Sequence, residues 1–337
     1  MKAVGFREPG PIDRDDALVD VTLDRPAPSG RDLLVEVKAV SVNPVDTKVR
    51  AGIAPIDVPV RVLGYDAAGT VAAVGDDVEG YRVGDDVFYA GSVVRQGTNA
   101  EFHLVDERIV GRKPASLTMA EAAALPLTAI TAWEMLFDRL DVRRAVPGAA
   151  NAVLVVGGAG GVGSIAIQIL RAMTGLTVIA TASRPETQAW VRELGAHHVV
   201  DHSNPLDAEI AALGIGAPAF VFSTNQTGSH AEAIAKLIAP QGRFGMIDRS
   251  GDIPLAAFMP KSVSIHWEYM FTRSMFQTAD MAAQRALLDE VSGLVDSGRI
   301  RTTMTESLGP ITAANLKVAH AKLESGTARG KIVLEGF

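Results

Sequence analysis

The segment Val153–Gly163, VLVVGGAGGVG, limits the possible folds of this chain more than any other part of the sequence. Its first four residues are aliphatic and run into a glycine cluster, and Ser164–Leu170 then carries apolar residues at helical spacing. A strand, a glycine turn and a helix in this order are the context in which a G-x-G-x-x-G string indicates a dinucleotide site. Gly158, Gly160 and Gly163 fill the three glycine positions.

The three glycines have separate physical roles in such a site. The first allows a sharp turn, the second leaves room for a pyrophosphate beside the backbone, and the third lets the helix lie close to the strand. The start of the helix, with Gly161 and Val162, then directs amide groups and partial positive charge at the phosphates. We therefore expect a dinucleotide here; a glycine-rich turn without a ligand is the alternative.

The residues after the next strand indicate which dinucleotide binds. That strand is Thr177–Ala182, and Ser183 and Arg184 follow it where a protein that prefers NAD usually has Asp or Glu. A hydroxyl and a guanidinium can bind the 2′-phosphate that a carboxylate would repel. The pattern therefore favours NADPH. Alternatively, Arg184 is only the solvated start of a helix that continues through Pro185 and Glu186.

Composition narrows the class of protein. A chain of 337 residues can form two domains with full cores, and 47% hydrophobic with 21% charged residues is typical of a globular protein. A net charge of −7 without basic runs argues against nucleic acid or an anionic membrane as a partner. No signal peptide or membrane span is evident, so we expect a cytoplasmic protein. The absence of cysteine excludes disulfides, thiolate metal sites and cysteine nucleophiles.

The chain changes character along its length, which indicates an α/β fold with two domains. The first 120 residues are rich in expected strands, at Leu33–Val42, Thr70–Val74, Val83–Tyr89, Ala100–Val105 and Arg108–Lys113. Residues 119–140 have a helical pattern that Pro126 must divide, with Thr118 and Glu121 as a capping pair.

From residue 152 to about residue 265 strands and helices alternate, which predicts a parallel sheet covered on both faces. The expected strands are Val153–Val156, Thr177–Ala182, His198–Val200, Ala219–Phe222, Arg243–Ile247 and Ser262–His266. The final segment, with helices at Ala279–Ser297 and Thr312–Ser325 and strands at Thr302–Leu308 and Lys331–Glu335, is too small to be a third domain. We expect it to complete the first domain.

Four further segments, together with the glycine loop, carry a resemblance to a known family. They are SVNPVDTKVRAG (Ser41–Gly52), VLGYDAAGTVAAVG (Val62–Gly75), YRVGDDVF (Tyr81–Phe88) and ALPLTAITAW (Ala124–Trp133). With these segments the chain resembles the medium-chain dehydrogenase/reductase superfamily over nearly its whole length, and within it the zinc-free quinone oxidoreductase branch. Its C-terminal half is similar to a bacterial subgroup often labelled zinc-type alcohol dehydrogenase-like.

The resemblance implies a GroES-like β-rich catalytic domain from residues 1–124 and 272–337, and a doubly wound Rossmann domain from residues 125–271. It also implies a homodimer. Zinc-dependent members carry Cys at the position of Asn43, a His–Glu pair at Tyr65 and Asp66, and a second Cys. This donor set is lost here, so no metal is expected. Three histidines, His197, His198 and His202, do not replace it, because a strand between them separates their side chains.

Without a metal to polarise an alcohol, the easier reaction is hydride transfer from NADPH to a quinone or an α,β-unsaturated carbonyl. The resemblance places Asn43, Asp46 and Tyr65 in the wall that faces the nicotinamide. Asn43 could donate an amide N–H to the carbonyl, Tyr65 could donate its phenolic proton, and Asp46 would position them. The plainer alternatives are an Asn–Pro turn at residues 43–44 and a packed tyrosine.

Other residues are weaker candidates for cofactor contacts. Thr128 and Thr131 match family positions near the nicotinamide, although both could simply bond to the helix backbone. His202 could flank the 2′-phosphate or adenine, and Lys331 could reach the phosphates if the last strand returns beside them.

A cluster of apolar residues near the end of the second domain suits a small hydrophobic carbonyl or quinone substrate. It comprises Trp267, Tyr269, Met270 and Phe271. Aromatic residues and Met are also enriched in cores and dimer interfaces, which remain alternatives. Two rival functions also remain, a zinc-dependent alcohol dehydrogenase and an NADPH-binding sensor or structural protein without turnover.

Overall fold

The computed structural model describes residues 1–55, 57–248 and 251–337. It divides into two compact units: unit 1 comprises residues 1–130 and 271–337, and unit 2 comprises residues 131–270. The sequence predicted these divisions at 124/125 and 271/272. The first division lies later because helix α3 (Pro126–Trp133) begins in unit 1, where the Leu127 amide bonds to the Asp66 carboxylate.

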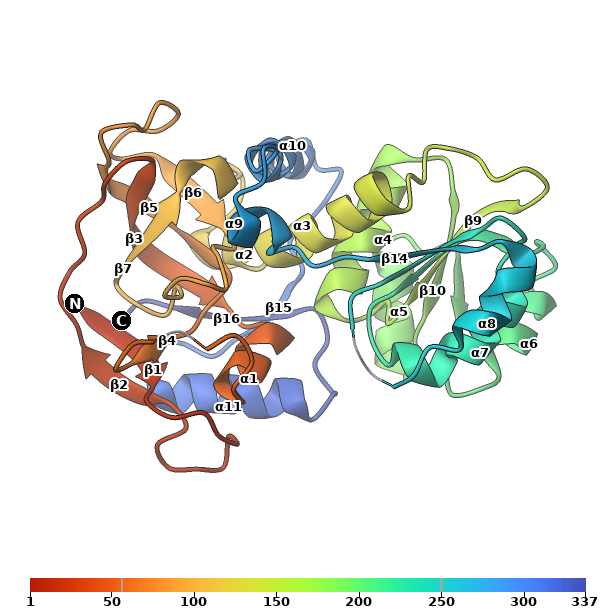
Figure 1. Cartoon of the computed structure of the whole chain (residues 1–337), viewed down its shortest axis with the longest axis horizontal. Helices are drawn as coiled ribbons and strands as arrows, with labels where there is room; N and C mark the ends of the chain where they lie inside the picture. Colours follow the sequence, from red (N-terminus) through yellow and green to blue (C-terminus); the bar gives the residue numbers. More distant parts are fainter. Residues whose placement is uncertain (56, 249–250) are drawn as a thin grey trace. The chain divides into compact units, whose positions relative to one another are not determined.

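Unit 1 is built on a mixed sheet whose described strands follow the order β15-β16-β3-β5-β6-β8, with β7 also pairing with β3 (Figure 1). Strands β1, β2 and β4 form a separate small sheet. The strand bounds are β1 Lys2–Phe6, β2 Val19–Thr22, β3 Asp32–Ser41, β4 Arg61–Val62, β5 Ala67–Val74, β6 Asp86–Tyr89, β7 Phe102–Asp106, β8 Val110–Arg112, β15 Met304–Ser307 and β16 Lys331–Glu335.

Helical segments complete unit 1. They are α1 Pro44–Arg50, η1 Glu107–Ile109, α2 Met119–Ala123, α9 Thr272–Phe276, α10 Ala283–Asp296 and α11 Ala313–Glu324. The C-terminal segment therefore returns to the first domain, as its small size predicted. Strand β16 pairs antiparallel with the end of β3, with Val333 opposite Ser41. This register brings Lys331 to the residues that follow β3.

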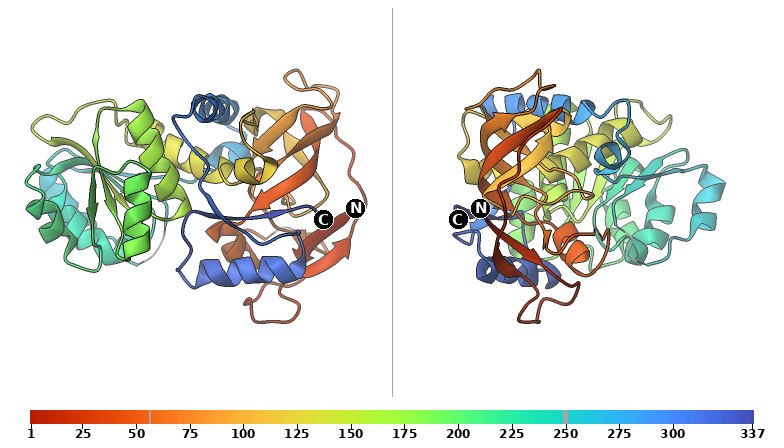
Figure 2. Two further views of the ribbon diagram at one scale, coloured as in Figure 1. Left: turned by 180° about the vertical axis from the view of Figure 1, so that it is seen from behind. Right: turned by 60° about the vertical axis from the view of Figure 1, so that its left-hand side comes forward.

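Unit 2 contains a parallel sheet whose described strands follow the order β11-β10-β9-β12-β13-β14 (Figures 1 and 2). The bounds are η2 Glu134–Arg139, β9 Ala150–Val156, α4 Gly161–Met173, β10 Thr177–Thr181, α5 Pro185–Glu193, β11 His198–Val200, α6 Leu206–Ala212, β12 Pro218–Ser223, α7 Thr227–Leu237, β13 Arg243–Met246, α8 Leu255–Phe258, η3 Met259–Lys261 and β14 Ser264–Trp267. The order reverses direction at β9, which makes the sheet doubly wound.

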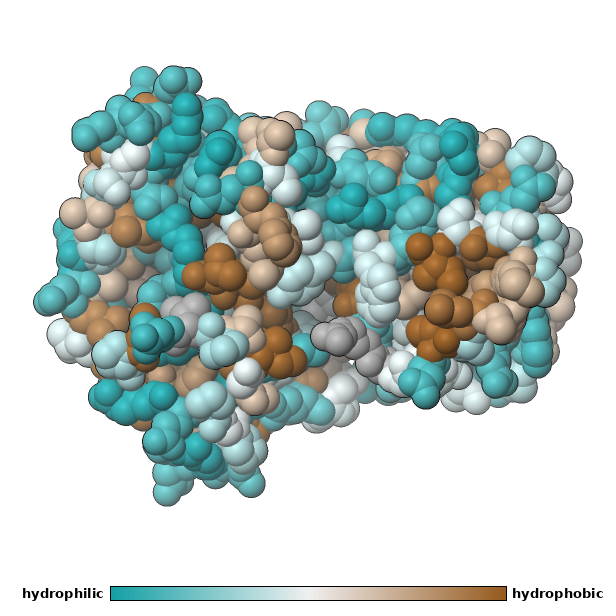
Figure 3. Space-filling view, in the orientation of Figure 1, coloured by the Kyte–Doolittle hydropathy of each residue, from teal (hydrophilic) through white to brown (hydrophobic). Residues whose placement is uncertain are grey.

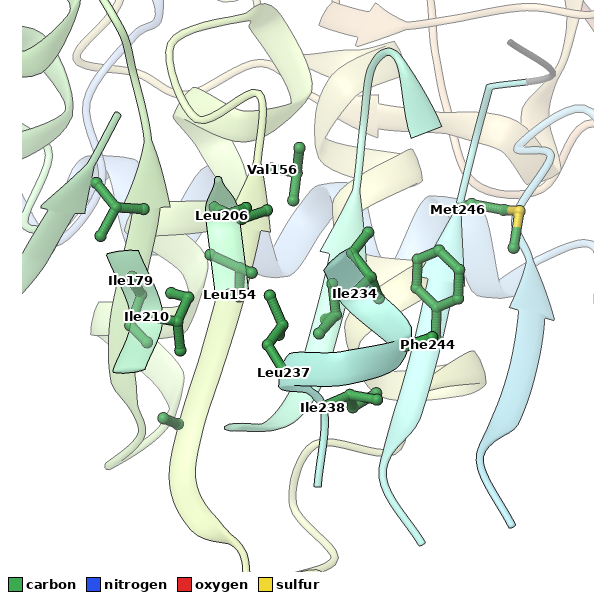
Figure 4. Close-up of a cluster of buried hydrophobic side chains, with 14 of the residues drawn as sticks. Leu154, Val156, Ile179, Leu206, Ile210, Ile234, Leu237, Ile238, Phe244 and Met246 are labelled. Carbon is green, nitrogen blue, oxygen red and sulfur yellow. The ribbon is translucent and has the colours of Figure 1, made fainter. Parts of the chain in front are cut away.

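One face of this sheet packs against α6, α7 and α8. Figure 4 shows side chains of this core that come from the sheet and from α6 and α7. The sheet contributes Leu154, Ile179 and Phe244, and the helices contribute Ile210 and Ile234, all buried. Burying each such side chain stabilises the fold by about 1.5–3 kcal/mol. The sheet is thus a rigid base for the loops at its ends.

The predicted strands and helices are confirmed, with shifted bounds. Thr118 and Glu121 form the predicted capping box of α2, and Pro126 begins α3. The sequence analysis missed β1, β2 and β4, which have only two to five residues each. It also missed that residues 134–139 are π-helical. None of the helices in the described residues has the length and apolar character needed to cross a membrane.

Candidate functional site

The glycine loop of unit 2 lies between the carboxyl end of β9 and the start of α4. Gly163 is required by packing, since a Cβ there would lie 2.3 Å from the Gly157 carbonyl oxygen. At Gly158 a Cβ would lie 2.9 Å from the Ala180 Cβ on the neighbouring strand. Both contacts are too close for a side chain, so these glycines set the approach of helix and strands.

Gly160 differs from these two positions. It is the N-cap of α4 with ordinary extended backbone, and a Cβ there would meet only the Gly157 carbonyl oxygen, at 3.5 Å. The protein itself therefore does not require glycine at residue 160. Open space beside the amide-rich start of a thirteen-residue helix, where Gly161 and Val162 form the first turn, is what a pyrophosphate needs.

Thr181, at the end of β10, supports this loop and was missed by the sequence analysis. Its buried hydroxyl accepts a hydrogen bond from the Gly157 amide at 3.0 Å and bonds the Nδ1 of His202 at 3.1 Å. Burial lowers the pKa of His202, so its ring is neutral near pH 7. Threonine is common at the ends of strands, so the sequence contained no specific indication that Thr181 supports the loop.

Ser183 and Arg184 follow β10, where the sequence placed the 2′-phosphate contacts. Ser183 is half-buried, and Arg184 is the N-cap residue of α5, with Pro185 in the first turn. The Nε of Arg184 lies 3.2 Å from a carboxylate oxygen of the exposed Glu186. Arg184 therefore does begin a helix, as the alternative interpretation of this residue held. Its guanidinium nevertheless lies at the edge of the sheet where a dinucleotide would bind.

A buried ion pair dominates the polar residues of unit 1. The Nζ of Lys331 lies 2.9 Å from Asp66 Oδ2 and 2.9 Å from the Val42 carbonyl oxygen, and it also bonds to Asn43 Oδ1. These three acceptors match the three protons of an ammonium group. The placement does not favour the predicted contact between Lys331 and cofactor phosphates.

Asp66 is also fully bonded inside unit 1. Besides Lys331, it accepts hydrogen bonds from Asn43 Nδ2 at 2.8 Å and from the Leu127 amide at 2.7 Å. Burial raises the pKa of Asp66, and the ammonium and amide oppose that rise. The carboxylate therefore joins the end of β3, the start of α3 and strand β16.

Asn43 and Asp46 act on the backbone around this ion pair. The two oxygens of Asp46 accept the amides of Asn43 at 2.7 Å and Gly64 at 2.9 Å. Burial raises the pKa of Asp46 to about 7. The side chain of Asn43 forms hydrogen bonds with Asp66, with Lys331 and, at 3.4 Å, with the Ser41 carbonyl oxygen. Asn43 is therefore tied by its own neighbours in unit 1.

Tyr65 is buried and packs edge to face on Phe271, with ring centres 5.3 Å apart. Its hydroxyl oxygen accepts a hydrogen bond from Arg61 Nη2 at 3.0 Å, and the same guanidinium donates to the Val93 carbonyl at 2.6 Å. A guanidinium beside the phenol oxygen stabilises the charge left when the hydroxyl donates its proton. The sequence analysis missed Arg61, which begins the two-residue strand β4 between apolar neighbours.

The remaining predicted residues fall into two groups. Thr128 bonds the Leu125 carbonyl at 3.0 Å, which is the plainer alternative for it, and Thr131 is buried on the same helix. Met270 and Phe271 are buried, whereas Trp267 and Tyr269 are 54% and 45% exposed. The four apolar residues at 267 and 269–271 therefore do not form one continuous surface, since two are buried and two are exposed.

The architecture of the two units and the glycine loop together indicate the class of protein. A GroES-like domain together with a Rossmann-type parallel sheet is the construction of a nicotinamide-dependent oxidoreductase. Family models match in the same order: alcohol dehydrogenase GroES-like domain over residues 29–131, and zinc-binding dehydrogenase over residues 194–334. The chain belongs to the medium-chain dehydrogenase/reductase superfamily.

Several relatives are similar over most of their length. A zinc-type alcohol dehydrogenase-like protein of Staphylococcus aureus is 39% identical over 99% of both chains. The human mitochondrial NAD(P)H oxidoreductase RTN4IP1 is 30% identical, covering 90% of this chain and 81% of its own. A crystal structure from Rhizobium etli, whose name assigns it to the zinc-dependent alcohol dehydrogenases, is 68% identical with a TM-score of 0.99, covering 100% and 98% of the chains.

The names of two of these relatives mention zinc, but the residues of this chain at positions 43, 65 and 66 do not suit a zinc site. A catalytic zinc needs three protein ligands and an open fourth position. Here the amide at residue 43 and the carboxylate of Asp66 already share the ammonium of Lys331, and Tyr65 faces a guanidinium. Two cationic side chains repel a divalent ion. Within residues 1–55, 57–248 and 251–337, no group of three His, Asp or Glu side chains could hold a metal.

Proposed function

We propose that this oxidoreductase is zinc-independent and transfers a hydride from NADPH to a quinone or an α,β-unsaturated carbonyl. The observation that carries the proposal is the contact of Lys331 with Asn43 and Asp66, since a protein cation occupies the donors that zinc would need. A reaction that requires no Lewis acid suits such a site. Quinones and enones are electrophilic enough to accept a hydride directly.

The preference for NADPH is supported by unit 2. No carboxylate stands directly after β10, and the guanidinium of Arg184 lies there instead. Gly160, Gly161 and Val162 would receive the pyrophosphate, and Thr181 would hold the loop in place. When bound, the nicotinamide supplies the hydride. The human relative at 30% identity is named an NAD(P)H oxidoreductase, a name that supports a nicotinamide cofactor and covers both NADH and NADPH.

Tyr65 is the proposed proton donor, because Arg61 stabilises negative charge on its phenol oxygen. Asn43 and Asp46 are assigned positioning roles, since their polar groups bond to Asp66, Lys331 and backbone amides. This differs from the predicted amide contact between Asn43 and the substrate. The physical reason is that the side chain of Asn43 already has partners for both its oxygen and its nitrogen.

The proposal includes a homodimer that uses the outer edge of unit 2. Among the described strands β14 pairs only with β13, so its other edge is open. Trp267 on this strand and Leu255 and Met259 nearby in sequence are 54%, 62% and 75% exposed. Figure 3 shows apolar side chains gathered where Figure 1 places α8. A second copy would cover this surface, which favours the interface alternative for Trp267.

One assay tests the function. Chelator-treated protein is given NADPH or NADH with a panel of quinones, enones and aldehydes, and NADP⁺ with alcohols. We expect NADPH oxidation with a quinone or an enone that added zinc does not increase. Alcohol oxidation that needs stoichiometric zinc would establish the zinc-dependent alternative. NADPH binding without turnover on any acceptor would establish a sensor or structural protein.

A further inference from the structure

Arg61, in strand β4 of unit 1, is a buried arginine whose hydrogen bonds are incomplete. Its Nη2 donates to the hydroxyl oxygen of Tyr65 at 3.0 Å and to the carbonyl oxygen of Val93 at 2.6 Å. Nε and Nη1 are buried as well, but they have no hydrogen-bond partner in the part of the chain that the structure describes. The guanidinium therefore keeps one unpartnered proton on Nε and two on Nη1.

Arg61 also differs from the other buried cations of unit 1, because it has no counter-ion. Among the described residues of this unit, each other buried cation contacts a carboxylate, in the pairs Lys331–Asp66, Arg50–Glu324 and Arg273–Asp280. Arg61 forms no ion pair with an Asp or Glu side chain of residues 1–55, 57–248 or 251–337. A buried charge is unfavourable unless a partner compensates for it. The guanidinium of Arg61 therefore favours an anion that this part of the chain does not supply.

The backbone of Arg61 is held in place by its neighbours in unit 1. Gln96 accepts the Val62 amide at 2.8 Å and donates to the Val60 carbonyl oxygen at 2.9 Å, so its side chain is bonded to the backbone on both sides of Arg61. On β1, a Cβ at Gly5 would lie 2.5 Å from the Arg61 carbonyl oxygen, so the two strands pack closely. A cation on such a fixed backbone binds an anion with little loss of conformational freedom.

The unpartnered nitrogens of Arg61 lie beside the proposed proton donor. The phenol oxygen of Tyr65 is bonded to Nη2 of the same rigid, planar guanidinium, so an oxygen atom bound to Nε or Nη1 lies close to the phenol. The buried ring of Phe271 packs edge to face on Tyr65, at an interplanar angle of 72°. This part of unit 1 thus combines aromatic side chains with one unpaired cation, which suits a conjugated ligand that carries one negative charge.

A carboxylate is the anion that matches this cation best. It carries one negative charge against the single positive charge of Arg61, and its oxygens accept hydrogen bonds from a guanidinium. A neutral carbonyl accepts the same hydrogen bonds but leaves the buried charge unpaired. A phosphate group carries a charge of about −1.5 to −2, which exceeds what one arginine compensates.

We propose that Arg61 binds a carboxylate of the substrate, so that the hydride acceptor is a quinone or an α,β-unsaturated carbonyl compound that bears a carboxylate. This inference rests on the proposed function and specifies its substrate class. Arg61 then has two tasks, because Nη2 supports the Tyr65 oxygen while Nε and Nη1 hold the carboxylate. Loss of the carboxylate contact raises the KM of acidic acceptors alone, whereas loss of support for Tyr65 lowers kcat for every acceptor.

Two enones that differ in charge test the proposal: the para-carboxy derivative of benzylideneacetone and its neutral methyl ester. Their reduction by NADPH is measured with wild-type protein, Arg61→Met and Arg61→Lys. For wild-type protein we expect the KM of the acid to be about tenfold lower than that of the ester, or lower still, as for a hydrogen bond to a charged group. Arg61→Met should abolish this difference and lower kcat for both enones. Arg61→Lys keeps the charge and should retain part of the difference.

Arg82→Gln is the matched control, because it removes a positive charge from unit 1 at a side chain that is 89% exposed. This variant should keep the wild-type ratio of the two KM values. If Arg61→Met changes kcat but leaves that ratio as in the wild type, Arg61 acts through Tyr65 alone and the carboxylate contact is disproved.

Thermal unfolding tests the contact without turnover and on the unaltered chain. With NADP⁺ present, which cannot reduce an enone, the acid should raise the Tm of wild-type protein more than the ester does, since a ligand stabilises the folded state that binds it. Equal KM values and equal Tm shifts for the two enones in wild-type protein would overturn this inference and leave the proposed function intact. If wild-type protein oxidises NADPH with neither enone and with no quinone, the proposed function fails, and this inference fails with it.

Discussion

The glycine loop of unit 2 and the ion pair of unit 1 differ in what the sequence predicted about them: the residues and geometry of the loop followed from its motif, whereas the contact between Lys331 and Asp66 did not. The loop is a contiguous stretch in which each glycine meets atoms of its own strand, helix or neighbouring strand. The ion pair joins Asn43, Asp66 and Lys331, which are up to 288 residues apart. Roles set by local packing follow from a motif, whereas roles set by distant partners depend on which strands pair.

The largest effect on NADPH binding is expected at Gly163. Gly163→Ala puts a methyl group 2.3 Å from the Gly157 carbonyl oxygen, so strand and helix must separate. Overpacking of this kind costs about 1–3 kcal/mol, and the displaced loop should lose NADPH affinity by more than tenfold. Thermal unfolding and NADPH titration measure the two losses.

Gly160→Ala is the matched control, because its methyl group meets only one atom, at 3.5 Å. This variant should keep the stability of the wild type and lose only NADPH affinity. If both variants lose stability equally, the distinction between a packing glycine and a ligand-facing glycine is wrong.

Lys331→Met should destabilise unit 1 and leave NADPH binding nearly unchanged. It removes the ammonium from a carboxylate that is fully buried, at a cost of about 3–5 kcal/mol. The double variant Lys331→Met with Asp66→Asn should recover much of this loss, because no charge is left alone. Denaturant unfolding measures the free energies, and NADPH titration of the folded variants discriminates between the roles. A loss of NADPH affinity without loss of stability would restore the predicted phosphate contact.

Much of the fold could be predicted because periodicity and turn residues are local signals. The strands around the glycine loop, the capping box at Thr118 and the division at Pro126 all followed from short patterns. The positions of Asp46, Lys331 and Arg61 could not be predicted, since their partners are set by the pairing of β16 with β3 and by loop packing. The π-helical turn that carries Glu134 also has no distinct sequence period.

Trp267→Arg tests the open edge of β14. A charge on this exposed strand should prevent a second copy from pairing there, so light scattering should report a monomer. The fold should be unaffected, because the side chain is 54% exposed. Phe276→Arg serves as a control, because Phe276 is also exposed, at 72%, but lies on α9 in unit 1. Dimers in both variants would disprove the assignment of this edge.

Arg184→Ala tests the NADPH preference. Loss of one charge-assisted contact with a 2′-phosphate should raise the KM for NADPH about tenfold and leave the KM for NADH nearly unchanged. Glu186→Gln, which removes the carboxylate beside the guanidinium, should lower the KM for NADPH slightly. Equal effects of Arg184→Ala on both cofactors would show that Arg184 is only the start of α5.

Thr181→Val should have the smallest effect, because it removes a support of the loop rather than a contact with the cofactor. The substitution keeps the shape of the buried side chain and deletes the acceptor for the Gly157 amide and the partner of His202. A neutral hydrogen bond contributes about 1 kcal/mol, so NADPH affinity should fall roughly fivefold. Thr181→Ser keeps the hydroxyl and should retain most of the affinity. If the Val variant binds NADPH like the wild type, the glycines alone fix the loop. Local packing would then determine the cofactor site of unit 2 without support from Thr181.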